Sequence, residues 1–152
     1  MRILLPVDGS EHSYAAVEAL IARPWPSGTQ VEVLSVAHSA PEFIDTMLVG
    51  RDLHLQTLKR AVKQAEENVE RAAEAIARAT HLLAATTKVV EGTPRDAILQ
   101  EAAEWDADLI MMGSQGLGAA LRFLLGSVSG AVALHAPCSV EIVRKRAEKP
   151  TT

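Results

Sequence analysis

Two glycine-rich segments contain the residue types that bind phosphate groups. Gly113-Ser114-Gln115-Gly116 follows an apolar run, and nine residues separate Gly116 from Gly126-Ser127. Backbone N–H groups can approach an anion closely at glycine, and a helix beginning at Ser127 would add N–H donors and the positive end of its dipole. Ser127 and Ser129 would add hydroxyl donors at the same helix end. The pattern predicts a phosphate site built mainly from backbone.

These glycines match neither of two well-known phosphate-binding motifs. No lysine follows them, so the segment is not a Walker A loop, and Gly116-Leu117-Gly118 lacks the third glycine of a dinucleotide-binding turn. Asp8-Gly9-Ser10 follows another apolar run and competes as a ligand-binding loop, because ligands of open α/β sheets bind at the carboxyl ends of strands. Taken alone, the glycines are also compatible with tight turns and helix caps.

Apolar runs alternate with helical patterns, which predicts the scaffold for these loops. The five predicted strands are Arg2 to Val7, Gln30 to Val36, Thr86 to Val90, Asp108 to Met112 and Ser139 to Val143. Helices are predicted from Ser10 to Pro24, from about Leu53 to Thr80, from Thr93 to Trp105 and from Ser127 to His135. Five strands with four intervening helices favour an open α/β sheet, parallel with right-handed crossovers. Residues 38–52 show no clear pattern.

Capping residues and apolar periodicity support these helices. Ser10 is a suitable N-cap, and Thr93 followed by Pro94 gives an N-cap with proline at the first helical position. The long helix has apolar residues at alternating steps of three and four: Leu55, Leu58, Val62, Ala65, Val69, Ala72 and Ile76. Such a stripe fits a coiled-coil seam or a helix that covers a sheet, and its alanine content favours the sheet.

The composition bounds the class of protein. With 152 residues, 48% of them hydrophobic, we expect a single domain over residues 1–146 and a short polar tail over residues 147–152. Aromatic residues make up 3%, so the core must consist of Ala, Val, Leu and Ile. A formal net charge of -4 argues against a nucleic-acid partner, and no apolar stretch reaches the roughly 20 residues of a membrane span. The single Cys138 excludes an intrachain disulfide and favours a reducing cytoplasm.

Other catalytic chemistry finds little support. The five histidines lack metal-ligand spacing, no G-x-S-x-G elbow is present, and Asp106 and Asp108 flank a strand start rather than a cleft. We therefore expect no catalytic side chain and no protein metal site.

The chain resembles the universal stress protein family along nearly its whole length. The resemblance lies in residues 3–10, 108–116, 124–129 and 135–138 and in the closing strand. ATP-binding members of that family carry G-x-x-G, nine residues and G-[ST], and this chain has that motif in full at Gly113, Gly116, Gly126 and Ser127.

The resemblance implies a fold and a ligand. The fold is a Rossmann-like, five-stranded parallel sheet of order 3-2-1-4-5, similar to the adenine nucleotide alpha-hydrolases, with helices on both faces. ATP or another adenine nucleotide would bind between strands one and four, with Mg²⁺ held mainly by phosphate oxygens. The residues implied around it are Pro6, Val7, Asp8, Gly9, Ser10, Val36, Met112, Gly113, Gln115, Gly116, Gly126, Ser127, Val128 and Ser129.

The family also implies roles for these residues. Asp8 would accept a hydrogen bond from the ribose, Val36 would pack on the base, and Met112 with Gly113 would flank the ribose. The phosphates would lie against Gln115, Gly116 and residues 126–129. Position 115 is often His or Arg in relatives, so Gln115 would bind phosphate charge more weakly.

The resemblance also leads to expectations about the oligomeric state and the activity of the protein. Members commonly dimerise through the last strand, and a homodimer through Ser139 to Val143 is expected here although Glu141 interrupts its apolar run. The leading hypothesis is an ATP-binding stress-response and signalling protein whose nucleotide-dependent state is sensed by a protein partner. One alternative is a weak ATPase or autophosphorylating protein using Arg122 and either Ser127 or Ser129. Another is a nucleotide-free dimerisation module. Valine at Gly113 or Gly126 should abolish binding and leave the fold largely intact.

Overall fold

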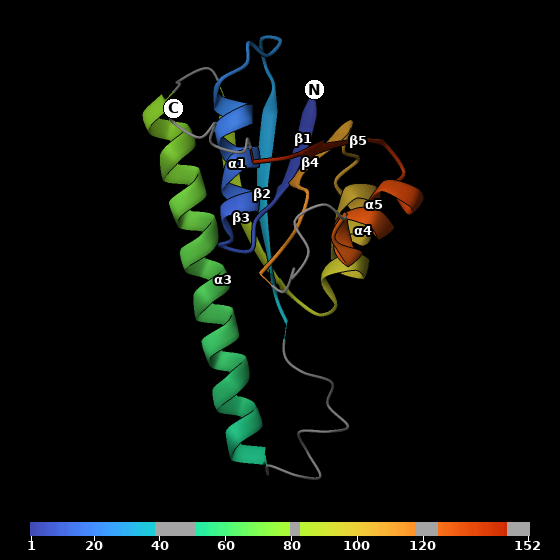
Figure 1. Cartoon of the computed structure of the whole chain (residues 1–152). Coiled ribbons are helices and arrows are strands. Elements are labelled where there is room, and N and C mark those ends of the chain that lie inside the picture. Colours follow the sequence, from blue (N-terminus) through green and yellow to red (C-terminus); the bar gives the residue numbers. More distant parts are fainter. Residues whose placement is uncertain (39–50, 80–82, 118–124, 146–152) are drawn as a thin grey trace, which may run out of the picture.

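The computed structural model describes residues 1–38, 51–79, 83–117 and 125–145, without the side chains of 51–54. Its elements, drawn in Figure 1, are β1 (Arg2–Pro6), α1 (Glu11–Ile21), β2 (Gln30–Ala37), α3 (Arg51–Ala79), β3 (Ala84–Glu91), α4 (Pro94–Glu104), β4 (Leu109–Gly113), α5 (Ser127–His135) and β5 (Ser139–Val143). All strand pairs are parallel, and the order is β3-β2-β1-β4-β5. The predicted fold class and strand order are confirmed. The predicted polar tail lies outside the described residues.

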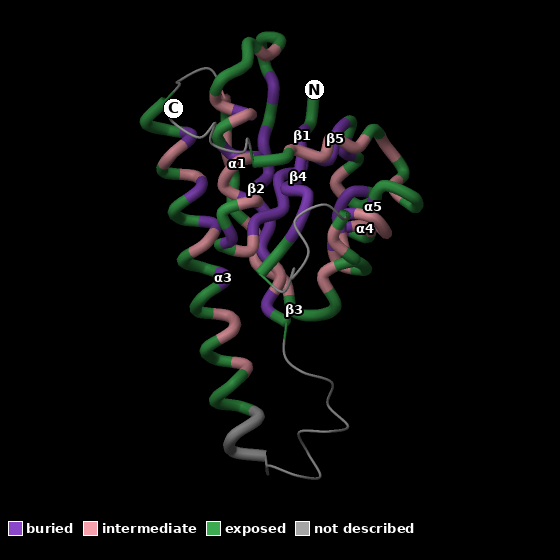
Figure 2. The backbone as a smooth tube through the Cα atoms, viewed as in Figure 1, coloured by how far each residue is buried: buried purple, intermediate pink, exposed green. Residues whose placement is uncertain are grey.

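Helices cover both faces of the sheet. In Figure 1, α1 and α3 lie on one face, and α4 and α5 lie on the other. Successive strand residues point to opposite faces, so Ile3 and Leu5 pack beneath α1 and α3, whereas Leu4 packs with Ile98 of α4 and Val132 of α5. Figure 2 shows the buried residues concentrated along the central strands. The largest fully buried side chains are Ile, Leu, Val and one Met, which confirms the predicted aliphatic core.

The predicted N-caps of α1 and α4 are both in place, but only the cap of α1 makes a side-chain hydrogen bond. Ser10 is the N-cap of α1, and its hydroxyl accepts a hydrogen bond from the Ser13 N–H at 3.1 Å. Thr93 is at the N-cap of α4, followed by Pro94, but its hydroxyl makes no capping bond. The extended backbone of Thr93 and the fixed φ of proline are sufficient to start α4 there.

Only part of the apolar stripe of α3 covers the sheet. Ala65, Val69, Ala72 and Ile76 are buried, whereas 52% of Leu55 is exposed. The reason is geometric, because the N-terminal part of α3 extends past the ends of the strands (Figure 1). None of the helices in the described part of the chain is both long enough and apolar enough to cross a membrane.

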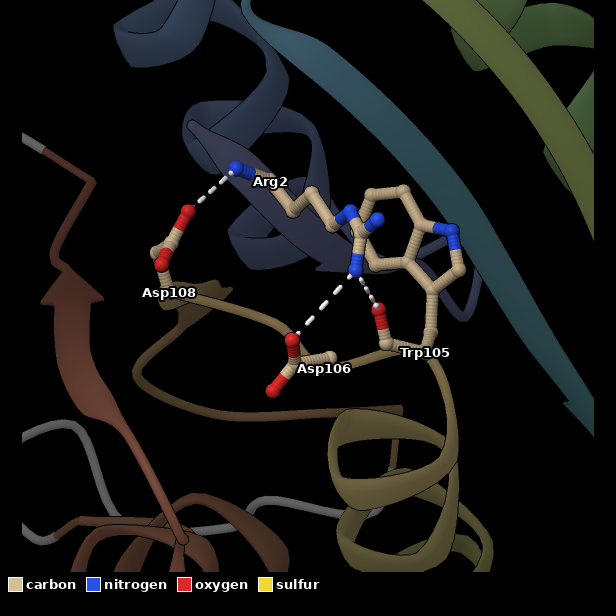
Figure 3. A network of polar contacts seen from close by, with 4 residues as sticks. All are labelled: Arg2, Trp105, Asp106 and Asp108. Carbon is tan, nitrogen blue, oxygen red and sulfur yellow. Dashed lines mark hydrogen bonds and ion pairs between the residues drawn. The ribbon is translucent and has the colours of Figure 1, made fainter.

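A polar network ties β1 to the start of β4 at the amino end of the sheet (Figure 3). An Asp108 carboxylate oxygen accepts a hydrogen bond from the Arg2 backbone N–H at 2.7 Å, and the Asp108 N–H donates to the Arg2 carbonyl at 2.9 Å. The Arg2 guanidinium donates to the Trp105 carbonyl at 3.2 Å and lies 3.5 Å from Asp106. Both residues flank the start of β4 as predicted; Asp108 ties β1 to β4, whereas the exposed Asp106 adds only a weak surface ion pair.

Candidate functional site

A cavity of about 710 Å³ opens where β1, β2 and β4 end. This volume lies within the range of small-molecule and cofactor sites. The chain builds β2 and β3 on one side of β1 and places β4 and β5 on the other, so β1 and β4 flank the topological switch point. Ligands of open α/β sheets bind at such points. The cavity is therefore where the fold itself predicts a site.

Twelve of the fourteen predicted site residues line this cavity. They are Pro6, Val7, Asp8, Val36, Met112, Gly113, Gln115, Gly116, Gly126, Ser127, Val128 and Ser129. Gly9 and Ser10 lie instead beside a smaller depression next to Arg71 and Lys145. Gly9 adopts a positive φ of 80°, and Ser10 caps α1, so these two residues shape the turn after β1.

Asp8 connects the turn after β1 with the loop after β4. One carboxylate oxygen accepts a hydrogen bond from the Ser10 N–H at 3.0 Å, and the other accepts from the Leu117 N–H at 3.1 Å. A Cβ on Gly116 would lie 2.7 Å from that second oxygen, which is closer than real Cβ contacts come. Glycine at position 116 thus allows the loop to approach Asp8.

The N-terminus of α5 faces the cavity and is held by the glycine loop. Its N-cap is Gly126, which provides no side-chain cap, and Ser127, Val128 and Ser129 form the first turn. The N–H groups of that turn have no acceptor within the helix and carry the positive end of its dipole. The Gly126 N–H donates to the Ser114 carbonyl at 2.8 Å, which fixes the helix end against the loop.

Ser129 contributes to this anchoring rather than offering its hydroxyl hydrogen to a ligand. Its hydroxyl donates to the carbonyls of Ser114 at 2.8 Å and Gly126 at 3.1 Å, and 2% of the residue is exposed. The backbone N–H of Ser129 remains as the donor toward an anion. Ser127 is exposed and is the more accessible of the two predicted phosphorylation candidates.

The expectation that valine at Gly113 leaves the fold largely intact is wrong. A Cβ at that position would overlap the backbone carbonyl of His12, because the end of β4 packs directly on the first turn of α1. Backbone cannot yield as a flexible side chain can, so the substitution would disturb the packing of α1 on the sheet. At Gly126 a Cβ would be 3.2 Å from the Gln115 Cα, which also leaves little room for valine.

Sequence reasoning missed the wall that α3 contributes. Ala61, Gln64, Ala65 and Asn68 line the cavity at helical spacings of three and four. That spacing marks one face of a helix, but the sequence does not say that the face borders a ligand site. His38 also lines the cavity at the end of β2, with its Nδ1 3.1 Å from the Gly92 carbonyl oxygen.

Charged groups are scarce around the cavity. Among the described lining residues, Asp8 is the only aspartate, glutamate, lysine or arginine. Arg122, the cation considered for phosphoryl transfer, lies outside the described residues. Within the described ranges, no group of three or more His, Cys, Asp and Glu side chains could hold a metal ion. Within the described part of the lining, attraction for an anion therefore comes mainly from backbone dipoles.

Comparisons with known proteins agree with this architecture. The sequence model of the Universal stress protein family matches residues 1–144. A universal stress protein of Thermus aquaticus, named for its location in the QAH/OAS sulfhydrylase 3' region, is 36% identical over 142 residues, covering 93% of this chain and 97% of the relative. The structure of the universal stress protein UspA from Lactobacillus plantarum aligns with a TM-score of 0.79 at 24% identity, covering 95% of this chain and 97% of that one.

Two further similar structures contain adenine nucleotides. A universal stress protein family protein of Arabidopsis thaliana with AMP bound aligns with a TM-score of 0.64 at 21% identity, over 97% of this chain and 93% of that one. A universal stress protein in complex with cAMP aligns with a TM-score of 0.58 at 25% identity, over 95% and 96% of the two chains.

Proposed function

The chain belongs to the universal stress protein family, and on this premise we propose that it binds ATP or another adenine nucleotide in the cavity between β1 and β4. Bound nucleotide would bias the loops around the cavity, and a protein partner would sense the difference in a stress response. The observation that carries the proposal is the uncapped N-terminus of α5, held by the glycine loop and facing a cavity of nucleotide size.

The lining residues fit a ligand with one apolar end and one anionic end. Val36, Ile98 and Met112 offer an apolar surface for a base. The glycine loop and the first turn of α5 offer N–H donors for phosphates. Mg²⁺ would be held by phosphate oxygens and water, since Asp8 is the only carboxylate among the described lining residues. The AMP and cAMP in similar structures support the adenine class.

We favour a binding protein over an efficient ATPase. In enzymes that transfer phosphoryl groups, cations that stabilise the transferred group account for much of the rate enhancement. No lysine or arginine belongs to the described cavity lining. Tight binding without product after long incubation is expected. Substantial turnover that Arg122→Ala abolishes would instead support the enzyme alternative.

Mass spectrometry of ligand released from freshly purified protein tests the proposed function. We expect an adenine nucleotide in the released fraction, and calorimetry with ATP, ADP, AMP and cAMP should rank its preferences. If no adenine nucleotide co-purifies and none of the four gives a binding signal, the nucleotide-free dimerisation module is the better description.

We further propose a homodimer through the exposed edge of β5. The charge of Glu141, which interrupts the apolar run, is compensated within the chain, because Arg23, just after the end of α1, forms an ion pair with it at 2.6 Å. Light scattering after size exclusion should give a dimer mass, and Arg23→Ala should weaken the dimer by exposing an uncompensated charge at the edge. A monomer at all concentrations would contradict the proposal.

A further inference from the structure

The face of α3 that borders the cavity carries two amide side chains. Gln64 and Asn68 line the cavity one helical turn apart, with the small residues Ala61 and Ala65 beside them. The small side chains let a ligand approach the helix, and the amides provide the polar groups of this wall. Asn68 lies against Gly9, directly after Asp8, since a Cβ on Gly9 would be 2.6 Å from the Asn68 Oδ1.

This wall is neutral although the helix is highly charged. The exposed surface of α3 between residues 59 and 70 carries Lys59, Arg60, Lys63, Glu66, Glu67 and Glu70. None of these six lines the cavity, where α3 presents only alanine and amide side chains. A neutral polar wall suits a neutral polar part of a ligand and is a poor match for its phosphates.

The two amides are hydrogen-bonded to each other, and each keeps a polar group for a further bond. Gln64 Nε2 donates to Asn68 Oδ1 at 3.3 Å. An amide has two N–H donors and an oxygen acceptor, so Gln64 Oε1 and Asn68 Nδ2 can still bond to a ligand. Turning both amides over exchanges these roles and still leaves one free donor and one free acceptor.

The amide pair and the phosphate-binding helix lie on opposite sides of the sheet. In Figure 1, α3 covers one face and α5 covers the other, and both reach the cavity at the carboxyl ends of the strands. The apolar surface of Val36, Ile98 and Met112 lies on the α4 side, so a nucleoside in the cavity would lie between that surface and the amides of α3.

We propose that Gln64 and Asn68 select the nucleoside of the bound nucleotide by hydrogen bonding to the neighbouring donor and acceptor atoms of adenine. This inference rests on the proposed function. Adenine presents an amino group beside a ring nitrogen, which a carboxamide oxygen and nitrogen match as a pair. At the edge where adenine presents its amino group beside N7, guanine presents two acceptors, N7 and O6, so one of its groups would face the amide oxygen without a hydrogen bond. The pair therefore favours adenine over guanine.

Binding measurements on Gln64→Leu and Asn68→Ala test the inference. Calorimetry with ATP, GTP, AMP and inorganic tripolyphosphate separates the nucleoside from the phosphates. Each variant should bind ATP and AMP about fivefold to tenfold more weakly, as expected for loss of one hydrogen bond. Affinity for tripolyphosphate should stay unchanged, and the preference for ATP over GTP should shrink. Gln56→Leu, an exposed glutamine of α3 outside the cavity lining, is the matched control and should bind like the wild type.

Each outcome has a defined meaning once circular dichroism and melting temperature show that the variants fold. An unchanged ratio of ATP to GTP affinity, or equal losses for ATP and tripolyphosphate, overturns the role of the amide pair while leaving nucleotide binding in place. A wild-type protein that binds neither ATP nor AMP overturns the proposed function itself.

Discussion

The Asp8 Oδ2 atom lies 3.1 Å from the backbone nitrogen of Leu117, so a side chain at the end of β1 holds the loop that follows β4. These two segments are 109 residues apart in the chain and meet at the switch point of the sheet. The same carboxylate lines the cavity. Asp8 therefore has two tasks under the proposed function, since it organises the glycine loop and would also face the nucleotide.

Replacing Asp8 by alanine should impair both tasks. Hydrogen bonds from Ser10 and Leu117 would be lost, and a bond in such a partly exposed turn contributes about 0.5 to 1.5 kcal/mol. We expect the free energy of unfolding to fall by about 1 to 2 kcal/mol and ATP affinity to fall at least about tenfold. Urea unfolding and calorimetry measure the two effects. Asp8→Asn keeps one oxygen acceptor and should be intermediate, whereas wild-type affinity in Asp8→Ala would disprove the ligand role.

Gly116→Ala tests the close approach of the glycine loop to Asp8. The new methyl group would lie 2.7 Å from the Asp8 carboxylate and would displace it, because the end of a side chain yields more easily than backbone. We expect about a tenfold loss of ATP affinity, which corresponds to about 1.4 kcal/mol, with a smaller loss of stability. Calorimetry and thermal unfolding on the same preparation separate the two quantities.

Gly130→Ala is the matched control for that variant. Position 130 lies inside α5, and a Cβ there would meet only Leu125 at an ordinary contact distance of 3.6 Å. Alanine is favoured over glycine within a helix, so the free energy of unfolding should rise by about 0.5 to 1 kcal/mol. ATP affinity should not change. A loss of binding in this control would show that α5 tolerates no side chain there.

The polar network at the amino end of the sheet should affect stability without affecting the ligand. Asp108→Ala removes the 2.7 Å bond to the Arg2 N–H and should lower the free energy of unfolding by about 1 to 2 kcal/mol. Asp106→Asn should change it by less than about 0.5 kcal/mol, because the Asp106 side chain is 93% exposed and 3.5 Å from Arg2. ATP affinity should be unchanged in both, since the cavity lies at the opposite end of the strands. Reduced affinity in either variant would contradict this separation.

The sequence predicted the elements well because their signals are local. Capping by Ser10, proline at position 94 and the apolar strands are each encoded within a few neighbouring residues. The bounds of α5 and β5 agree with the predicted Ser127 to His135 and Ser139 to Val143. The strand order came from the family resemblance, since local patterns do not say which strands are neighbours.

The α3 side of the cavity could not be predicted, because it depends on where a helix packs. The same apolar periodicity runs from Leu55 to Ile76, yet only its C-terminal part meets the sheet. Gln64 and Asn68 look like ordinary surface amides until the structure places them at the cavity. Glu32 is a similar case, since a glutamate in a strand is usually exposed but this one is buried next to Glu101 of α4.

Glu32 belongs to a buried charged cluster on the α4 side of the sheet. It lies on β2 with 8% of its surface exposed, next to Glu101 of α4. Lys88 of β3 forms an ion pair with Glu101 at 2.6 Å, and its pKa is raised mainly by that hydrogen bond. The Oε1 atom of Glu32 has no hydrogen-bond partner among the described residues. Burial, followed by the hydrogen bond with Glu101, raises the pKa of Glu32 to about 7.

This raised pKa predicts that Glu32 reduces stability as the pH increases. The folded protein holds the Glu32 proton more tightly than the unfolded chain, so stability should fall as pH rises from about 4.5 to about 7 and then level off. Glu32→Gln removes the charge and can donate to Glu101. It should therefore match the wild type near pH 4.5 and be more stable by about 1 to 3 kcal/mol above pH 7. Urea unfolding across this range measures the difference, and Glu104→Gln, an exposed glutamate of α4, should show no such trend. A constant difference between Glu32→Gln and the wild type at all pH values would mean that Glu32 is already ionised in the folded protein near pH 4.5.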